Sequence, residues 1–397
     1  MYPEIQIPAS KSISNRLLIL QYLFPEIQIK NLSTAEDSLT LYKALKSINT
    51  SPGEINIGHA GTAMRFLTAL LSIHDGKSFI LDGSKRMRQR PIGLLVDALN
   101  QLGADISYVS KKGYPPLQIT GKTLKKNKIK IPANVSSQYI TAMMLIAPKL
   151  PDGLIIELTG KQVSTPYIDM TLQILQQAGI KVIKQNSVIK IQPTKNLDPQ
   201  VFHIEGDWSS ASYFYGGLLF SNQPEIVLSS FFKPSIQGDS RVVEYFKKLG
   251  IKTVYMPEKQ RILLQKIPNF KLPDFIEFDL LHTPDLAQTL AITCLALKIR
   301  CKLTGLETLK IKETDRLSAL QTEMQKLGAD VEISNDSLEI THPEIKTVKT
   351  ITINTYNDHR MAMSFAILQK KYPVISIADK DVVIKSFPGF WQAFKQI

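Results

Sequence analysis

The stretch 317-LSALQTEMQKLGADVEI-333 contains the pattern that decides the fold. Its apolar residues recur at a spacing of three and four, which predicts an amphipathic helix. Gly328 follows as a helix-ending residue, and the alternating run after it predicts a β-strand. The same pattern occurs at 94–109, 172–184 and 242–255, and its four glycines are 71 to 78 residues apart. The chain is therefore built from a repeated unit of mixed helix and strand.

A second recurrent pattern is a more hydrophobic helix whose first turn is small and polar. Its six copies begin at Ser10, Gly61, Ser136, Ser209, Pro284 and Asn357. Four of the five intervals between these starts are 73 to 75 residues, and the first is 51 residues, which indicates a trimmed first unit. Each period holds two helices with short strands between them and is too long for a solenoid. The pattern predicts an α/β fold with two domains of three units each.

The overall composition is that of a globular protein. The chain has 397 residues, of which 44% are hydrophobic and 21% are charged, and this length suits about two domains. No apolar run approaches the ~20 residues that a membrane helix needs. The opening MYPEIQIPASK has neither a basic region nor an apolar core of a secretory signal. We therefore expect a cytoplasmic protein.

The net charge of +13 leaves two classes of partner open. A basic chain can bind nucleic acid, or it can attract a small polyanionic substrate. Its lysines are scattered, which favours a solvated basic surface over a nucleic-acid stripe. The two cysteines, Cys294 and Cys301, have no matching histidine spacing, so buried free thiols are expected rather than a disulfide or zinc site. No metal cluster or dinucleotide fingerprint is present, and no cofactor is expected.

The six polar helix starts are candidate anion sites. A helix N-terminus carries unsatisfied N–H groups and about half a positive charge. In 8-PASKSISNRLLIL-20, the first start, Lys11, Ser12 and Arg16 precede or open the apolar run, although no glycine-rich phosphate loop comes before them. An ordinary capped helix with solvated basic residues would give the same string. The starts together, however, favour one shared site for an anion.

The densest charged string is 312-KETDRLSAL-320. Two acids lie between Lys312 and Arg316, and mutual ion pairing on a solvated helix turn is one interpretation. The other is acid–base chemistry combined with anion binding. The candidate residues along the whole chain are the cations Lys11, Arg16, Arg90, Lys312, Arg316, Arg360 and Lys385, and the acids Asp285 and Glu313. This set indicates a ligand with several negative charges.

Taken together, the motifs resemble those of the 5-enolpyruvylshikimate-3-phosphate (EPSP) synthase family. SKSISNR, GTAMR, RPIG, SSQ, STPYID, QGDSR, PDLAQT, KETDR, YNDHRMAM and KSFP occur in family order over nearly the whole chain. The resemblance implies two inside-out α/β barrel domains, each of three βαβαββ-type repeats, that close over substrates at a hinge. These domains would be 11–204, and 1–10 with 205–397. It also implies a monomer without cofactor or metal, and a target of glyphosate.

The reaction that the resemblance implies is transfer of the enolpyruvyl group of phosphoenolpyruvate to the 5-hydroxyl of shikimate 3-phosphate, on the shikimate pathway to chorismate and the aromatic amino acids. Asp285, Glu313 and Lys11 would be catalytic. Shikimate 3-phosphate would be held by Lys11, Ser12, Arg16, Ser136, Ser137, Gln138, Ser164, Asp285 and Lys312. Phosphoenolpyruvate would be held by Lys11, Gly61, Arg90, Gln138, Arg316, Arg360 and Lys385.

Three positions depart from the family pattern. His59 replaces a frequent Asn, Thr308 replaces an Asn that contacts the substrate phosphate in many members, and Phe66 replaces a frequent Pro. Gly61 is retained, which favours sensitivity to glyphosate, whereas Phe66 after Arg65 favours only moderate sensitivity.

Three alternatives remain to be compared. A UDP-N-acetylglucosamine enolpyruvyl transferase typically has a reactive Cys in a mobile loop, whereas both cysteines here lie in apolar or strand-like segments. A nucleic-acid-related protein of the same fold would suit the positive charge but not the retained acid pair. A non-catalytic remnant would suit His59 and Thr308 but not the retained Lys11, Asp285 and Glu313.

Overall fold

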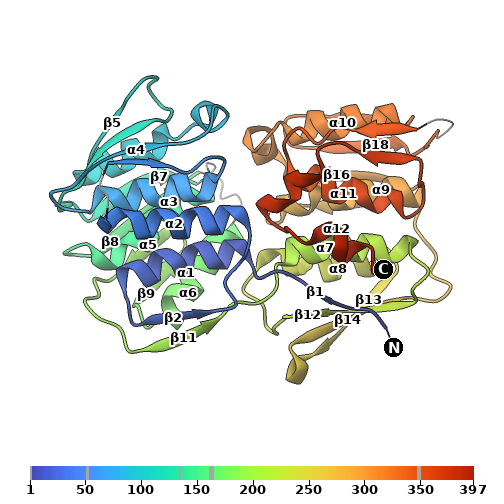
Figure 1. The fold of residues 1–397 in the computed structure, drawn as a ribbon, viewed down its shortest axis with the longest axis horizontal. Helices are drawn as coiled ribbons and strands as arrows, with labels where there is room; N and C mark the ends of the chain where they lie inside the picture. The colour runs from blue at the N-terminus through green and yellow to red at the C-terminus, as the bar shows by residue number, and fades with distance from the viewer. Residues whose placement is uncertain (1, 51–52, 134–135, 161–164, 347–349) are drawn as a thin grey trace. The chain divides into compact units, whose positions relative to one another are not determined.

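The computed structural model describes residues 2–50, 53–133, 136–160, 165–346 and 350–397. Its contacts divide the chain into two compact units. We call these the N-terminal unit (Lys11–Ile204) and the C-terminal unit (Met1–Ser10 with Glu205–Ile397). Both units mix helices with sheets (Figure 1), so the fold is of the predicted α/β class.

The N-terminal unit contains both helices and strands. Its helices are α1 (Lys11–Leu23), α2 (Glu36–Thr50), α3 (Gly61–Ser72), α4 (Gly93–Leu102), α5 (Ser137–Ile146) and α6 (Thr165–Gln177), with the short 3-10 turns η1 (Met87–Gln89) and η2 (Ala147–Lys149). Its strands are β2 (Ile27–Lys30), β3 (Glu54–Asn56), β4 (Ser78–Asp82), β5 (Asp105–Tyr108), β6 (Leu117–Thr120), β7 (Lys128–Pro132), β8 (Leu154–Thr159), β9 (Val182–Gln185), β10 (Val188–Ile191) and β11 (Gln200–His203).

The C-terminal unit follows the same plan. Its helices are α7 (Trp208–Phe220), α8 (Val242–Lys247), α9 (Ala287–Leu297), α10 (Arg316–Lys326), α11 (His359–Gln369) and α12 (Phe390–Phe394). Its 3-10 turns are η3 (Gly238–Arg241), η4 (Pro257–Lys259), η5 (Pro284–Leu286), η6 (Glu307–Ile311) and η7 (Lys380–Lys385). Its strands are β1 (Glu4–Gln6), β12 (Glu225–Ser229), β13 (Ile251–Met256), β14 (Arg261–Lys266), β15 (Phe275–Asp279), β16 (Arg300–Thr304), β17 (Asp330–Ile333), β18 (Leu338–His342), β19 (Ile351–Ile353) and β20 (Ile375–Ile377).

The sheets show the repeat directly. Four sheets have four strands each, in the orders β3-β4-β6-β5, β7-β8-β10-β9, β15-β16-β18-β17 and β1-β12-β14-β13. In every one the first pair is parallel and the other two pairs are antiparallel. The segment β3-α3-β4-α4-β5-β6 is thus a βαβαββ unit, and β7 and β15 begin two more.

Two of the six repeats are shorter. The first and the last have parallel two-stranded sheets, β11-β2 and β19-β20, within the described part of the chain. The sequence predicted trimming only of the first unit. The last unit keeps the regular start-to-start spacing of its helix, so the interval gave no sign of its smaller sheet.

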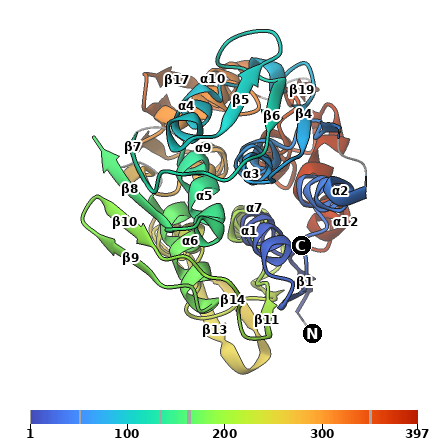
Figure 2. The ribbon, with the colours of Figure 1, turned by 90° about the vertical axis from the view of Figure 1, so that its left-hand side faces the viewer.

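Helices form the centre of the N-terminal unit, and sheets lie outside them. Figure 2 shows α1, α3 and α5 with the strands of the unit around them. In α1 every residue from 13 to 20 is buried, and in α3 and α5 every residue is buried except Thr62 and Gln138. A helix that is apolar on all sides must be covered on all sides, which explains this inside-out arrangement.

The C-terminal unit has the corresponding buried helices α7, α9 and α11, which contact one another. Gly216 on α7 permits their close approach. A Cβ atom there would lie 2.5 Å from Cδ1 of Ile367 on α11 and 2.8 Å from Oγ1 of Thr293 on α9. Contacts this short would force the helices apart, so the position requires glycine.

The chain passes between the units beside a buried carboxylate. Ser10 N donates to the Glu205 carbonyl oxygen (2.9 Å), and Ala9 and Gly206 form an antiparallel bridge. The Glu205 carboxylate accepts from Ser235 Oγ (2.5 Å) and from Trp208 Nε1 (3.4 Å). Burial raises the pKa of Glu205, although these hydrogen bonds oppose that effect.

We expect Glu205→Ala to lower the free energy of unfolding of the C-terminal unit by about 1–3 kcal/mol, because it leaves buried donors without an acceptor. Glu205→Gln keeps one acceptor oxygen and should cost less. Both tryptophans of the chain, Trp208 and Trp391, belong to this unit. Urea unfolding followed by tryptophan fluorescence therefore measures the effect, with the exposed Glu258→Ala as control. Equal stability of the Glu205→Ala and Glu258→Ala variants would contradict this role.

Candidate active site

Two helix caps set the geometry of the charged cluster in the C-terminal unit. Asp315 Oδ1 accepts from the backbone N–H groups of Leu317 (3.1 Å) and Ser318 (3.2 Å) at the start of α10. Asp358 Oδ1 accepts from Arg360 N (2.8 Å) at the start of α11. Carboxylates at N-caps satisfy otherwise unpaired N–H groups. They also fix where the first-turn residues Arg316 and Arg360 leave the backbone.

Arg316 is the centre of this cluster, with a side chain that is 2% exposed. Its guanidinium donates to three carboxylates: Nε to Asp358 Oδ2 (2.7 Å), Nη1 to Asp285 Oδ1 (3.0 Å) and Nη2 to Glu313 Oε2 (2.9 Å). Burial alone would lower the pKa of Arg316, but the three carboxylates outweigh it and raise the pKa. The guanidinium is therefore charged, and in the absence of a ligand these three carboxylates set its direction.

The remaining cations contact the same two acids. Arg360 Nη2 lies 2.8 Å from Asp285 Oδ2, and Lys312 Nζ lies 4.0 Å from Asp285 Oδ1. Lys385 Nζ, at the end of η7, lies 2.9 Å from Glu313 Oε1. All six charged residues predicted in this unit thus form one network. Burial would raise the pKa of Asp285, but Arg360, Lys312 and Arg316 lower it well below its ordinary value, so the carboxylate is ionised at neutral pH.

Three further members of this network were not among the selected candidate residues, although Ser209 was named as a helix start: Asp358, Ser209 and Asp239. Ser209 Oγ donates to Asp239 Oδ2 and lies 3.4 Å from Arg360 Nη2. Burial, together with the negative charge of Asp285, raises the pKa of Asp239 to about 7. The strings QGDSR and YNDHR contain the two acids, but only the fold shows that they face Arg360 and Arg316.

At the first helix start, in the N-terminal unit, a carboxylate offsets the charge of Lys11. Lys11 Nζ lies 3.1 Å from Oδ2 of the buried Asp37, a residue of α2 that the sequence analysis did not select. The Ser12 carbonyl oxygen accepts from Arg16 Nη1 (2.8 Å).

Arg16 points into the unit rather than away from it. Its Nε donates to Thr171 Oγ1 (2.8 Å) and its Nη2 donates to the Tyr167 carbonyl oxygen (3.0 Å), so it joins α1 to α6. Burial lowers the pKa of Arg16 to about 10, which still leaves it protonated at neutral pH. Most of its donors are bound to neutral protein groups, and its charge is not balanced by a carboxylate among those partners.

A buried cation, Arg90, lies beside the second helix start. Arg90 is 9% exposed, and its Nε has no hydrogen-bond partner among the described residues. Gly61, the first residue of α3, lies against it: an added Cβ would be 3.0 Å from Arg90 Cζ. Arg65 donates to the Pro91 carbonyl oxygen (3.0 Å) and fixes the backbone beside Arg90. A buried cation with a free donor is the feature that an anion site requires.

The third helix start supplies hydroxyl and amide groups. Ser136 Oγ accepts from Gln138 N (3.4 Å) as the cap of α5, and Ser137 is buried. Gln138 Nε2 donates to Thr62 Oγ1 on α3 (3.2 Å), which brings the second and third starts together. The predicted residue Ser164 lies outside the described residues.

The departures from the family pattern have local partners or are buried. His59 Nδ1 lies 2.9 Å from Ser84 Oγ, and Phe66 is buried with its ring 5.9 Å from Arg16 Cζ. Thr308 Oγ1 is buried without a hydrogen-bond partner in the described part of the chain. Phe66 therefore packs inside the N-terminal unit, beyond the first turn of α3.

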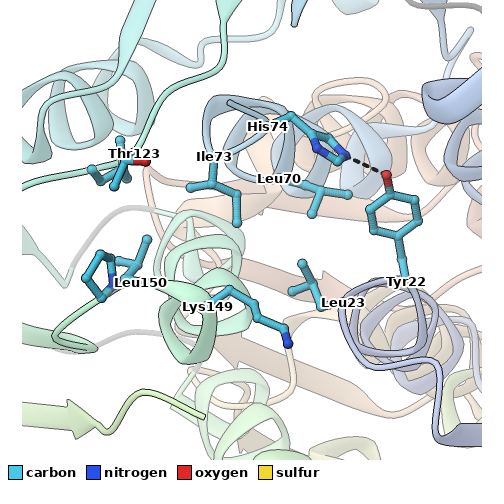
Figure 3. A pocket seen from close by; sticks show the side chains of 10 residues that line it. Tyr22, Leu23, Leu70, Ile73, His74, Thr123, Lys149 and Leu150 are labelled. Carbon is cyan, nitrogen blue, oxygen red and sulfur yellow. Dashed lines mark hydrogen bonds between the residues drawn. The ribbon is translucent and has the colours of Figure 1, made fainter. Parts of the chain in front are cut away.

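A cavity of about 540 Å³ lies at the other ends of the same helices (Figure 3). It is lined by Tyr22 and Leu23 from the end of α1, by Ile73 and His74 after α3, and by Lys149 at the end of η2, among others. Tyr22 Oη and His74 Nε2 are 2.5 Å apart across its rim. Because the C-terminal ends of α1 and α3 meet there, their N-terminal ends, with the predicted site residues, lie at the opposite end of the unit.

Two further properties concern the described residues as a whole. They contain no group of three or more metal-ligating side chains that could hold an ion. None of their helices has the length and hydropathy to cross a membrane.

Comparison with known proteins decides the family. Residues 2–394 match the family model described as EPSP synthase (3-phosphoshikimate 1-carboxyvinyltransferase). The chain belongs to the EPSP synthase family. A 3-phosphoshikimate 1-carboxyvinyltransferase of Bacteroides fragilis is 45% identical over 99% of this chain and 94% of its own length. A 3-phosphoshikimate 1-carboxyvinyltransferase of Colwellia psychrerythraea is 36% identical over 99% of this chain and 96% of its own length. An EPSP synthase structure from Acinetobacter baumannii has the same fold, with a TM-score of 0.76 at 20% identity over 100% of this chain and 97% of that one.

We expect Asp239 to make the stability of the unliganded protein depend on pH. Its folded pKa of about 7 lies above the ordinary value of 3.8, so its stabilising contribution is present below about pH 4 and is lost as the pH rises through 7. Asp239→Asn should therefore become more stable than the wild type as the pH rises from 5 to 8, in melting curves at each pH. The exposed Asp381→Asn is the control. A constant difference in Tm between wild type and Asp239→Asn would contradict the raised pKa.

Proposed function

We propose that this protein transfers the enolpyruvyl group of phosphoenolpyruvate to the 5-hydroxyl of shikimate 3-phosphate and releases phosphate, on the route to chorismate and the aromatic amino acids. The observation that carries the proposal is the network in which Arg316 and Arg360 hold the carboxylates of Asp285 and Glu313. It places two potential proton carriers among cations that suit a phosphorylated carboxylic acid. Family membership supports the same reaction.

Both units supply residues for each substrate in this proposal. Phosphoenolpyruvate is held by Lys11, Gly61, Arg90, Gln138, Arg316, Arg360 and Lys385. Shikimate 3-phosphate is held by Lys11, Ser12, Arg16, Ser136, Ser137, Gln138, Ser164, Asp285 and Lys312. The free Nε of Arg90 supports the first assignment, and the hydroxyl-rich start of α5 supports the second.

The reaction needs two proton transfers in each of its two steps. The 5-hydroxyl oxygen bonds to C2 of phosphoenolpyruvate and loses its proton, while a proton is added to C3. The tetrahedral product then loses a proton from the new methyl group and phosphate from C2, while a proton is added to the departing phosphate oxygen. Asp285 and Glu313 carry these protons, with Lys11 assisting, and the arginines stabilise the charge of the departing phosphate.

Substrate binding activates the acids by competition for the same cations. The carboxylate or phosphate of the substrate draws Arg316 and Arg360 away from Asp285, whose pKa those cations hold low. When these contacts weaken, burial raises the pKa of Asp285 toward that of an effective proton acceptor. Asp285 is therefore a weak base until the substrate arrives.

The oligomeric state, the compartment and the sensitivity to glyphosate are also proposed. The active form in this proposal is a monomer. Both substrates are multiply charged phosphate esters that do not cross membranes unaided, which supports the cytoplasm as the place of action. Glyphosate competes with phosphoenolpyruvate in the family, and we expect moderate sensitivity here.

Phosphate release from phosphoenolpyruvate, measured with and without shikimate 3-phosphate, tests the function. We expect release to depend on shikimate 3-phosphate. Equal rates in both conditions would overturn the assignment.

Glu313→Gln should reduce kcat by about 100-fold or more, because the amide cannot exchange a proton at neutral pH. It retains the shape of the side chain, so the KM values should change little. The matched control is Glu332→Gln on the exposed side of β17, which should keep full activity. A near-normal kcat in Glu313→Gln would remove Glu313 from proton transfer.

Gly61→Ala should raise the KM for phosphoenolpyruvate about tenfold or more, because its Cβ displaces the Arg90 guanidinium. The KM for shikimate 3-phosphate serves as an internal control and should stay within about threefold. Inhibition by glyphosate should weaken in parallel with phosphoenolpyruvate binding. An unchanged KM for phosphoenolpyruvate would show that Arg90 does not bind it.

A further inference from the structure

The loop that leads into α11 has an uncommon backbone. Tyr356 and Asn357 are consecutive residues with φ values of 55° each, in the left-handed region. Asn tolerates this region, whereas a bulky residue such as Tyr is rare there. Such a conformation persists only when the surroundings hold it. The next residue is Asp358, which caps α11 and bonds Arg316.

Glu323 on α10 holds this loop. Its carboxylate is completely buried and accepts from Tyr356 Oη (2.5 Å, to Oε1) and from the backbone N–H of Asn354 (3.1 Å, to Oε2). Lys326, one turn further along α10, contacts both oxygens at 2.7 and 2.8 Å. Burial, together with the hydrogen bond and charge of Glu323, raises the pKa of Tyr356 to about 12, so its hydroxyl remains a donor at neutral pH.

Arg316 and Glu323 lie on the same face of α10. They are seven residues apart, which corresponds to about two helical turns. Glu323 contacts the loop at Asn354 and Tyr356, and Arg316 contacts it at Asp358. The helix therefore holds the loop before the left-handed residues, at Asn354, at the left-handed Tyr356 itself, and after them, at Asp358.

We propose that Glu323 is a positioning residue for the anion-binding arginines Arg316 and Arg360. By fixing Tyr356, it fixes the direction of Asp358, which orients Arg316 through its side chain and caps the helix that begins with His359 and Arg360. The inference rests on the proposed function, because it assigns phosphoenolpyruvate as the ligand of those arginines. Glu323 itself touches no substrate.

Kinetics of Glu323→Gln and Tyr356→Phe test this role. The KM for phosphoenolpyruvate should rise about tenfold in the first and about threefold in the second, as expected from the loss of hydrogen bonds to a charged acceptor. The KM for shikimate 3-phosphate should stay within about twofold, because most of its proposed ligands are in the N-terminal unit. If Glu323→Gln does not fold, Tyr356→Phe alone decides.

The double variant shows whether the two residues act as one device. Tyr356→Phe should add little to the effect of Glu323→Gln, since one removes the hydroxyl and the other the charged acceptor of the same contact. Independent, multiplicative effects on the KM for phosphoenolpyruvate would contradict the proposal.

A stability control separates positioning from a merely structural role. Val331→Ala removes buried apolar volume on β17 of the same unit and should lower Tm without changing either KM. The proposal is overturned if the KM for phosphoenolpyruvate rises in proportion to the loss of Tm in both Val331→Ala and Glu323→Gln. It is also overturned if this KM is unchanged in both Glu323→Gln and Tyr356→Phe.

Hydrogen exchange gives a readout that does not depend on catalysis. Glu323→Gln should increase exchange about tenfold or more in peptides covering 354–362, where Asp358 accepts from the Arg360 N–H. Unchanged exchange would sink the positioning role, even if phosphate release confirms the enzyme activity. Increased exchange without any release dependent on shikimate 3-phosphate would retain the contact with Glu323 but reject phosphoenolpyruvate as the ligand.

Discussion

The C-terminal unit is organised around the buried guanidinium of Arg316. A charge removed from water must be paired on all its donors, and the loss of a partner is costly. Here the partners come from η5, from the residue three places before Arg316, and from the cap of α11. Satisfying one arginine therefore fixes the starts of several elements. It also orients Asp285 and Glu313, the two acids that we propose for proton transfer.

The cations of the two units have different kinds of partner. In the C-terminal unit Lys312, Arg316, Arg360 and Lys385 face Asp239, Asp285, Glu313 and Asp358, so cations and acids are equal in number. In the N-terminal unit Arg16 has neutral partners, and Arg90 Nε has no hydrogen-bond partner within the part of the chain that the structure describes. An anion gains most where a buried cation lacks a counter-charge. On this basis we propose that the N-terminal residues supply attraction, whereas the C-terminal residues supply acids whose pKa responds to the ligand.

The sequence predicted the features that depend on local spacing. The repeat, the α/β class and the polar starts of the buried helices follow from apolar periodicity and caps, and the charged motifs of the sequence contained six members of the Arg316 network, two of them at those starts. Residues defined by distant partners were missed. Asp358 contacts Arg316 from 42 positions away, and Asp37 contacts Lys11 from 26. Glu323 was missed for the same reason, because an acid in an amphipathic helix gives no sign that it is buried against a loop. The small last sheet was missed since the helix spacing remained regular.

The central claim is that cations of both units bind the same phosphoenolpyruvate molecule. Titration calorimetry of phosphoenolpyruvate in the presence of saturating shikimate 3-phosphate tests it most directly, with Arg90→Ala and Arg360→Ala compared with the wild type. Each substitution removes charge-assisted hydrogen bonds, so the account predicts that Kd rises by about 10- to 100-fold in both variants. A wild-type Kd in either variant would contradict the claim.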